Sequence, residues 1–203
     1  MNLRRMGEGA VLIETADFGE AHALRRALLE APLPGVRELI PGHSSLLIVA
    51  DPLILDLDSV AAQLPDIDQL QTPAMPGRLH EFSVIYDGED LGAVAKQLGL
   101  TEDEVVRRHT GPVYDVAFLG FVPGFPYLTG LDPGLRLPRR SRPRTRVPAG
   151  SVALADGYTG IYPQVTPGGW HILGRCRVRL FDATRGQPAL LMPGDRVRFT
   201  AGS

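Results

Sequence analysis

The hydrophobic positions in the first part of the chain follow the spacing of short strands. Apolar runs with β-branched residues cover Gly9–Thr15, Val36–Pro41 and Ser45–Ala50. Short runs of this kind predict strands. The last two runs are separated by residues 41–44 (PGHS), whose turn-forming residues predict a β-hairpin.

Two stretches in the same part of the chain have helical spacing instead. Apolar residues recur three or four positions apart in Ala16–Ala31, which ends before Pro32, and again in Asp56–Leu64. Asp56 or Asp58 is the candidate N-cap of the second helix. A strand, a helix, a hairpin and a second helix together predict a small α/β domain.

A linker and a change of pattern divide the chain. Residues 71–77 (QTPAMPG) have the composition of a linker, so we expect two domains, 1–76 and 77–203. After Val147, short apolar runs alternate with Gly and Pro turns, which is typical of an all-β barrel or sandwich. The strands expected there are Ser151–Ala155, His171–Gly174, Val178–Phe181, Ala189–Met192 and Arg196–Thr200.

The start of the second domain mixes strands with helices. Apolar spacing predicts a helix over Asp90–Leu98, and Thr101 with Glu104 matches the capping box of a helix that ends near His109. The overall class is therefore expected to be α+β. Strands are predicted over His80–Tyr86 and Val113–Leu119.

The segment between these elements, residues 120–175, is crowded with Gly, Pro, aromatic residues and Arg. Turn-forming residues favour irregular loops, and loops carry most binding and catalytic residues. Pro makes such backbone rigid, and Gly lets it approach a ligand closely. We therefore expect the functional site in this segment.

Composition restricts the classes of function. The 203 residues are 44% hydrophobic, enough to fill a core, and the net charge of −2 gives no reason to expect nucleic acid or a membrane as partner. The single cysteine, Cys176, excludes an intramolecular disulfide and a Cys-based zinc site. No apolar stretch has the length of a signal peptide or a bilayer span, so we expect a cytoplasmic protein.

Six arginines follow one another closely without an intervening acid. Planar guanidiniums bind carboxylate or phosphate with two hydrogen bonds, so the cluster is a candidate anion site. A solvated basic loop, or one that faces an acidic partner, fits equally well. Alternation with Pro and Ser argues against a nucleic-acid-binding helix. The six are Arg136, Arg139, Arg140, Arg142, Arg144 and Arg146.

Three further motifs in this segment each allow more than one interpretation. Amides at Gly150 and Ser151 are candidate oxyanion donors, or they form a tight turn. Trp170, after Gly168 and Gly169, is a wall for a flat ligand, a core residue or an interface anchor. The aromatic residues of GFVPGFPYL plug the core or form an exposed patch.

The titratable residues give weaker signals. His171, beside Trp170, is the best-placed of the histidines for acid–base chemistry, whereas His109 could complement a helix C-terminus. The DGED sequence of residues 87–90 resembles a turn with a helix cap and lacks the spacing of a calcium loop, so no metal site is expected. Neither a Walker A sequence nor G-x-G-x-x-G is present.

Several of these blocks occur together in one known family. The chain resembles allophanate hydrolase subunit 1, now usually described as the B subunit of 5-oxoprolinase, a family that includes a sporulation histidine-kinase inhibitor. The resemblance covers nearly the whole chain. It rests on PGHSSLLI, YDGEDLGAVA, GFVPGFPYLTGLD, PRRSRPRTRVPAGSVALA, TGIYPQVTPGGW and LLMPGDRVRF.

The resemblance implies a small N-terminal α/β domain followed by a C-terminal cyclophilin-like β-barrel. It also implies two partner chains of the oxoprolinase: the C subunit, with a homologous barrel, and the A subunit. The heteromeric complex, a bacterial hydrolase, is expected to open 5-oxoproline to L-glutamate with ATP as co-substrate and Mg²⁺, and this chain is expected to be inactive alone.

The resemblance also directs attention to particular residues. Opening a lactam develops negative charge, which cations and amide donors stabilise. We expect Arg144, Ser151 and His171 in catalytic roles. The residues expected to bind substrate or nucleotide are Arg139, Arg140, Gly150, Tyr158, Gly168, Gly169 and Trp170.

The chain departs from the family pattern at Tyr158, where glutamine is usual, and this substitution puts the substrate in doubt. Other amide substrates related to urea are therefore an alternative. A regulator that binds a sensor histidine kinase is another, and it needs an exposed apolar patch such as Phe121, Phe125 and Tyr127. The barrel type also raises a prolyl isomerase, although fold alone is weak support for that activity.

Overall fold

The computed structural model describes residues 2–56, 60–64 and 77–202. The chain forms two compact units, Met1–Met75 and Pro76–Ser203. The expected linker over residues 71–77 lies outside the described residues except for Gly77, as does the candidate cap Asp58.

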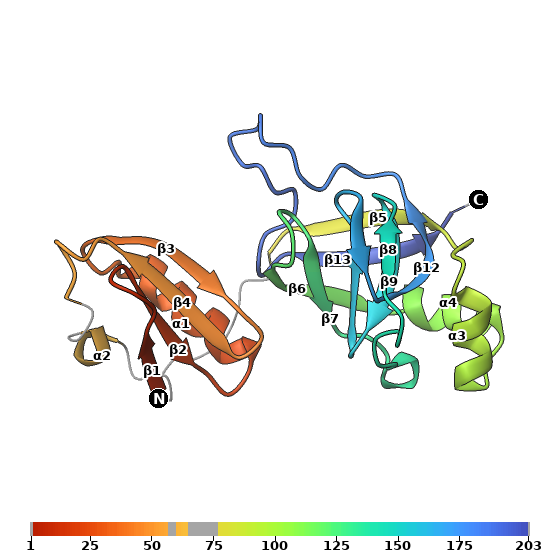
Figure 1. Ribbon diagram of the computed structural model, residues 1–203, viewed down its shortest axis with the longest axis horizontal. Helices are drawn as coiled ribbons and strands as arrows, with labels where there is room; N and C mark the ends of the chain where they lie inside the picture. Colours follow the sequence, from red (N-terminus) through yellow and green to blue (C-terminus); the bar gives the residue numbers. More distant parts are fainter. Residues whose placement is uncertain (1, 57–59, 65–76, 203) are drawn as a thin grey trace. The chain divides into compact units, whose positions relative to one another are not determined.

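The first unit is a four-stranded antiparallel sheet in the order β1-β2-β4-β3 with helix α1 against it (Figure 1). Asp17 caps α1 by accepting a hydrogen bond from the amide of Glu20 at 3.0 Å. The core between helix and sheet contains Leu24, Leu28 and Ile48. The elements are β1 (Asn2–Arg5), β2 (Ala10–Glu14), α1 (Phe18–Glu30), β3 (Val36–Pro41), β4 (Ser45–Ala50) and α2 (Val60–Gln63).

The second unit is a closed barrel whose described strands run in the order β10-β7-β6-β13-β5-β12-β9, beside a two-stranded sheet of β8 and β11. Neighbouring strands are antiparallel except β5 and β13, which are parallel. This barrel confirms the expected α+β class. Its strands are β5 (Leu79–Ile85), β6 (Val113–Leu119), β7 (Pro126–Thr129), β8 (Arg144–Val147), β9 (Ser151–Ala155), β10 (Tyr158–Ile161), β11 (Thr166–Gly168), β12 (His171–Cys176) and β13 (Arg196–Ala201).

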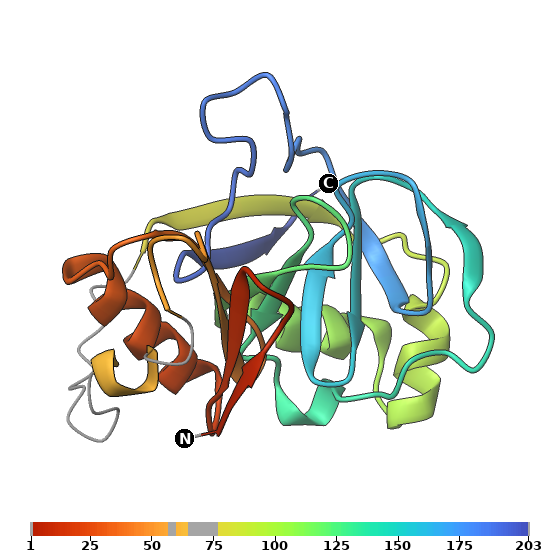
Figure 2. The same cartoon turned by 60° about the vertical axis from the view of Figure 1, so that its left-hand side comes forward.

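Helices α3 (Leu91–Leu98) and α4 (Glu102–Thr110) lie side by side at one end of the barrel (Figure 2). A short 3-10 helix covers Pro133–Leu135. Thr101 caps α4 as expected, by accepting a hydrogen bond from the amide of Glu104 at 3.2 Å. The Glu104 carboxylate does not close the capping box, because it binds Arg107 and Arg108 instead.

His109 in the last turn of α4 is fully buried, so it does not serve as the exposed cation expected at a helix C-terminus. Thr159 donates its hydroxyl hydrogen to the carbonyl of Ala153, so it accepts from His109 Nε2 at 2.8 Å. His109 Nδ1 then accepts from the Tyr86 hydroxyl at 2.7 Å. Burial lowers the pKa of His109 to about 3, which keeps the ring neutral.

Two predicted strands are wrong. Val178–Phe181 and Ala189–Met192 form only one isolated bridge, between Phe181 and Ala189, within a loop that extends away from the barrel (Figures 1 and 2). The barrel closes through β5, β12 and β13, so it offers these segments no free edge. Conversely, β7, β8, β10 and β11 form where loops were expected. Pairing within the barrel overrides the turn-forming composition at β7 and β10, and β8 and β11 pair with each other.

Candidate functional site

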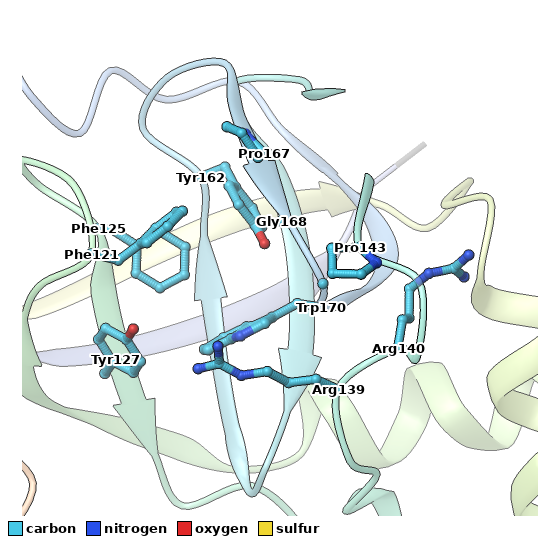
Figure 3. A pocket seen from close by; sticks show the side chains of 11 residues that line it. Phe121, Phe125, Tyr127, Arg139, Arg140, Pro143, Tyr162, Pro167, Gly168 and Trp170 are labelled. Atoms are coloured by element: carbon cyan, nitrogen blue, oxygen red, sulfur yellow. The ribbon is translucent and has the colours of Figure 1, made fainter. Parts of the chain in front are cut away.

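A cavity with a volume of about 260 Å³ opens on the barrel between the β6–β7 loop, the 139–143 loop and strand β11 (Figure 3). Five aromatic side chains and two arginines define its character. A pocket of this kind, largely apolar with a few polar groups, is typical of sites for small molecules. The lining residues are Phe121, Phe125, Tyr127, Arg139, Arg140, Pro143, Tyr162, Pro167, Gly168, Gly169 and Trp170.

The aromatic wall is built around Phe125, which is buried. Its ring packs edge to face on Tyr127, Tyr162 and Trp170, with ring centroids 5.1 to 5.2 Å apart. These arrangements are the favoured ones for aromatic pairs and fix ring positions. The wall is therefore preorganised, and it places part of the GFVPGFPYL motif in the core rather than on the surface.

Phe121 stands at the mouth of this cavity. It is 58% exposed and has a φ of +65°, a conformation that a bulky side chain rarely adopts. Its ring meets Phe125 and Tyr162 edge to face. A strained backbone of this type persists only where surrounding contacts hold it, and such positions cluster at functional sites.

Gly168 is required by the close approach of Tyr162. A Cβ atom at position 168 would lie 2.4 Å from the Tyr162 hydroxyl oxygen. This contact explains one glycine of the TPGGW motif in structural terms. The next residues, Gly169 and Trp170, continue the cavity wall into β12.

The two arginines of the lining point in different directions. Figure 3 shows the Arg139 side chain running beside the Trp170 ring, whereas the Arg140 guanidinium points away from the rings. Arg139 is exposed and pairs with the exposed Asp156, with Nε 3.0 Å from Oδ2. Of these two arginines, Arg139 is therefore the one that can contact a ligand bound between the aromatic rings.

Arg140 forms an ion pair with Asp90, a buried residue that no sequence motif identified as part of the site. Asp90 precedes α3 but does not cap it; its Oδ1 accepts from Arg140 and, at 2.8 Å, from Arg144. Its Oδ2 accepts from the amide of Ile172 at 2.8 Å. The interpretation of DGED as a turn with a helix cap missed these long-range contacts.

Arg144 is held inside the same cluster and does not line the aromatic cavity. Besides Asp90 it pairs with Glu89, with Nε 2.6 Å from Oε1. Burial by itself lowers the pKa of Arg144, but the two carboxylates more than offset this and raise it. Its geometry is that of a residue that holds the loop in place.

Gly150 and Ser151 form a structural turn rather than a donor site. The amide of Gly150 donates to the carbonyl of Tyr162 at 2.7 Å, and that of Ser151 donates to Pro148 at 3.3 Å. Gly150 has a φ of +82°, and a Cβ there would meet the Cys176 carbonyl oxygen at 2.4 Å. Both amides are thus occupied within the fold, which favours the tight turn over the oxyanion donor.

The remaining expected residues lie around the cavity without lining it. His171 Nε2 donates to the carbonyl of Pro138 at 2.9 Å and faces a second cavity behind the 138–142 loop. Tyr158 packs edge to face on Tyr127, a lining residue, with ring centroids 5.5 Å apart. The fold therefore brings together Arg139, Arg140, Gly168, Gly169 and Trp170 of the expected set.

Neither a metal cluster nor a membrane-spanning helix occurs in the part of the chain that the structure describes. Within residues 2–56, 60–64 and 77–202, no group of three or more His, Cys, Asp or Glu residues is arranged to hold a metal ion. No helix in those same ranges is long and apolar enough to cross a membrane.

Sequence comparison places the chain among proteins of one type. A family model described as "Carboxyltransferase domain, subdomain C and D" matches residues 1–191. The chain is 40% identical over 202 residues to the B subunit of 5-oxoprolinase from Escherichia coli O157:H7, covering 96% of this chain and 93% of that protein. It is 35% identical over 226 residues to the B subunit of 5-oxoprolinase from Bacillus subtilis, covering 97% and 91%.

Solved structures of other proteins have the same fold as this chain. The protein TTHA0988 superposes with a TM-score of 0.82 at 41% identity, and the match covers 96% of this chain. The chain spans only 40% of the length of TTHA0988. Urea carboxylase of Kluyveromyces lactis shares the fold, with a TM-score of 0.75 at 19% identity over 99% of this chain and 22% of that one.

Proposed function

Because this chain belongs to the family of 5-oxoprolinase B subunits, we propose that it is the B component of an ATP-dependent enzyme that hydrolyses 5-oxoproline to L-glutamate. One observation carries the proposal: relatives with that name match the chain over nearly its whole length at 35–40% identity. The aromatic cavity supports it, since it has the character of a small-molecule site.

The cavity suits a small ring that bears a carboxylate. The edge-to-face rings of Phe125, Tyr162 and Trp170 provide flat apolar walls against which such a ring can lie. Arg139 provides a guanidinium beside Trp170 (Figure 3), and this fork matches a carboxylate. In this proposal the walls exclude water from the bound lactam, and Arg139 orients it through its carboxylate.

The other arginines support this arrangement. Asp90 fixes Arg140 and Arg144, and the backbone amide of Arg140 donates to the carbonyl of Gly169 at 2.8 Å. We therefore propose positioning roles for Arg140 and Arg144. Ser151 and His171 would act indirectly, through the turn at Gly150 and through Pro138.

We propose that the active enzyme contains further polypeptides. The chain spans 40% of TTHA0988, so a unit of this type forms part of a longer polypeptide in that protein. The relatives are named as one lettered subunit of 5-oxoprolinase, which points the same way. The C and A subunits would complete the site, and the chain by itself would be inactive.

ATP, when bound, supplies the phosphoryl group that makes the lactam carbonyl reactive. The sequence offers no Walker A loop to hold it. Basic side chains of the 139–142 loop nevertheless suit phosphate oxygens in type, because guanidiniums bind them with paired hydrogen bonds. A nucleotide would thus be held in an unconventional way or shared with a partner chain.

The test is ATP-dependent release of glutamate from 5-oxoproline, measured for this chain alone and for its mixture with the A and C subunits of the same enzyme. The proposal expects turnover only in the mixture. Failure of a correctly assembled complex to release glutamate would overturn it. Other cyclic and linear amides would be assayed in parallel to identify a different substrate.

The histidine-kinase regulator finds less support in the geometry. That interpretation needs an exposed patch formed by Phe121, Phe125 and Tyr127. Phe125 is 1% exposed and Tyr127 is half-buried, so Phe121 is the one ring of the three that faces solvent. Tyr158 gives no support to a different amide substrate, because it is not one of the residues that line the cavity.

A further inference from the structure

A second cavity, with a volume of about 450 Å³, lies on the other side of the 138–142 loop from the aromatic rings. Its polar side chains come from that loop, from α3 and from the start of β12. They are Gln97, Arg139, Arg140, Ser141, Arg142 and His171. Among the described residues that line this cavity, none is acidic and none is aromatic apart from the histidine, so its lining differs from that of the first cavity.

The charge of this lining is only partly neutralised. Asp90 forms an ion pair with Arg140, and Asp156 forms one with Arg139. Arg139 runs beside Trp170 in the aromatic cavity, so its charge is directed to that cavity. Arg142 is exposed and forms no ion pair with any residue of the described ranges.

The loop that carries these cations is held at several points. The amide of Arg140 donates to the Gly169 carbonyl, the Arg140 guanidinium binds buried Asp90, and His171 Nε2 donates to the Pro138 carbonyl. A fixed backbone reduces the entropy cost of binding. Arg140 also keeps a buried Nε with no hydrogen-bond partner in the described structure.

We propose that this second cavity binds a phosphoryl group, either inorganic phosphate or the phosphate of an ester. Arg142 would provide the uncompensated charge, with the Ser141 hydroxyl as a further donor. A phosphate has three or more acceptor oxygens and takes paired hydrogen bonds from guanidinium. The site lacks aromatic walls for an organic ring, so its recognition is directed at the anion.

The inference deepens the proposed function, on which it rests for ATP as one source of the phosphoryl group, but the binding test requires no turnover and can succeed where the assembled enzyme releases no glutamate. The full chain, labelled with ¹⁵N, would be titrated at constant ionic strength with inorganic phosphate, ATP without metal, and acetate. We expect saturable shifts of the Ser141 and Arg142 amides with phosphate. Tighter binding of ATP would identify an ester as the source, and equal binding would identify inorganic phosphate.

Matched variants make the test specific. Arg142→Ala should weaken phosphate binding about 10-fold or more, since a hydrogen bond to a charged group is lost. Arg146→Ala removes an exposed arginine of the same segment that lines neither cavity, and it should leave binding unchanged. Absence of saturable binding, equal loss in both variants, or acetate binding as tight as phosphate would each overturn the proposal.

Discussion

The carboxylate of Asp90 accepts a hydrogen bond from the amide of Ile172 at 2.8 Å, which ties the start of α3 to β12 two residues after Trp170. The same carboxylate holds Arg140 and Arg144. One buried acid thus connects the helix, the 139–143 loop and the strand that carries the cavity wall. Two of the joined parts, the 139–143 loop and the residues just before β12, supply lining residues of the aromatic cavity.

Replacement of Asp90 by Ala should destabilise the chain by about 3–5 kcal/mol, because two cations would lose their buried partner. Urea unfolding followed by fluorescence of Trp170 would measure this. Asp156→Asn is the matched control: it removes an exposed charge that pairs with Arg139 while keeping a residue type that tolerates the left-handed backbone at this position (φ +52°), and it should cost about 0–1 kcal/mol. Similar losses in both variants would contradict the organising role of Asp90.

The buried histidine predicts acid sensitivity. The pKa of His109 is lowered to about 3 by burial, against an ordinary value of about 6.5. The unfolded chain therefore binds a proton that the folded chain does not. Stability is complete above pH ~6.5 and falls by up to about 1.4 kcal/mol per pH unit until pH ~3.

The variant His109→Gln isolates this contribution. Denaturant unfolding at pH 7 and pH 5 should show a loss about 2 kcal/mol larger for the native chain than for the variant, although the variant starts from lower stability. Carboxylates titrate equally in both proteins. Parallel pH profiles would show that His109 is not the titrating group.

Gly168→Ala should lower stability by about 1–3 kcal/mol, because the new methyl would stand 2.4 Å from the Tyr162 hydroxyl oxygen and force a shift of the cavity wall. Thermal unfolding would measure the effect. Gly186→Ala is the control, since a Cβ there meets nothing within 4 Å. A Gly168→Ala protein as stable as the control would mean that Tyr162 moves freely.

Under the proposed function, Arg139→Ala should raise the KM of the assembled enzyme for 5-oxoproline about 10- to 100-fold, since the proposed hydrogen bond between the guanidinium and the substrate carboxylate would be lost. The thermal stability of the chain should hardly change, because the Arg139–Asp156 pair is exposed. Initial rates over a range of 5-oxoproline concentrations provide the measurement. An unchanged KM would remove Arg139 from substrate binding.

Regular periodicity made much of the fold predictable. The predicted bounds of β3 and β4, Val36–Pro41 and Ser45–Ala50, agree with the structure. The helices α1 and α3 lie where apolar spacing placed them, and α4 lies where its capping-box residues placed it. The strand β4 and the helices bury one face each, so their sequence repeats with the period of the element. The Gly- and Pro-rich strands β7, β10 and β11 show no such repeat and were missed.

The sequence by itself determined the family, the local elements with clear periodicity, and the segment that supplies the lining of the aromatic cavity. Only the tertiary structure decided what each arginine contacts. Arg139 lies beside the aromatic rings, and Arg140 and Arg144 bind Asp90. Arg142 has no acidic partner among the described residues. Asp90 and Arg144 are 54 positions apart. Contacts of that separation are set by how the barrel closes, and no local pattern in the sequence records them.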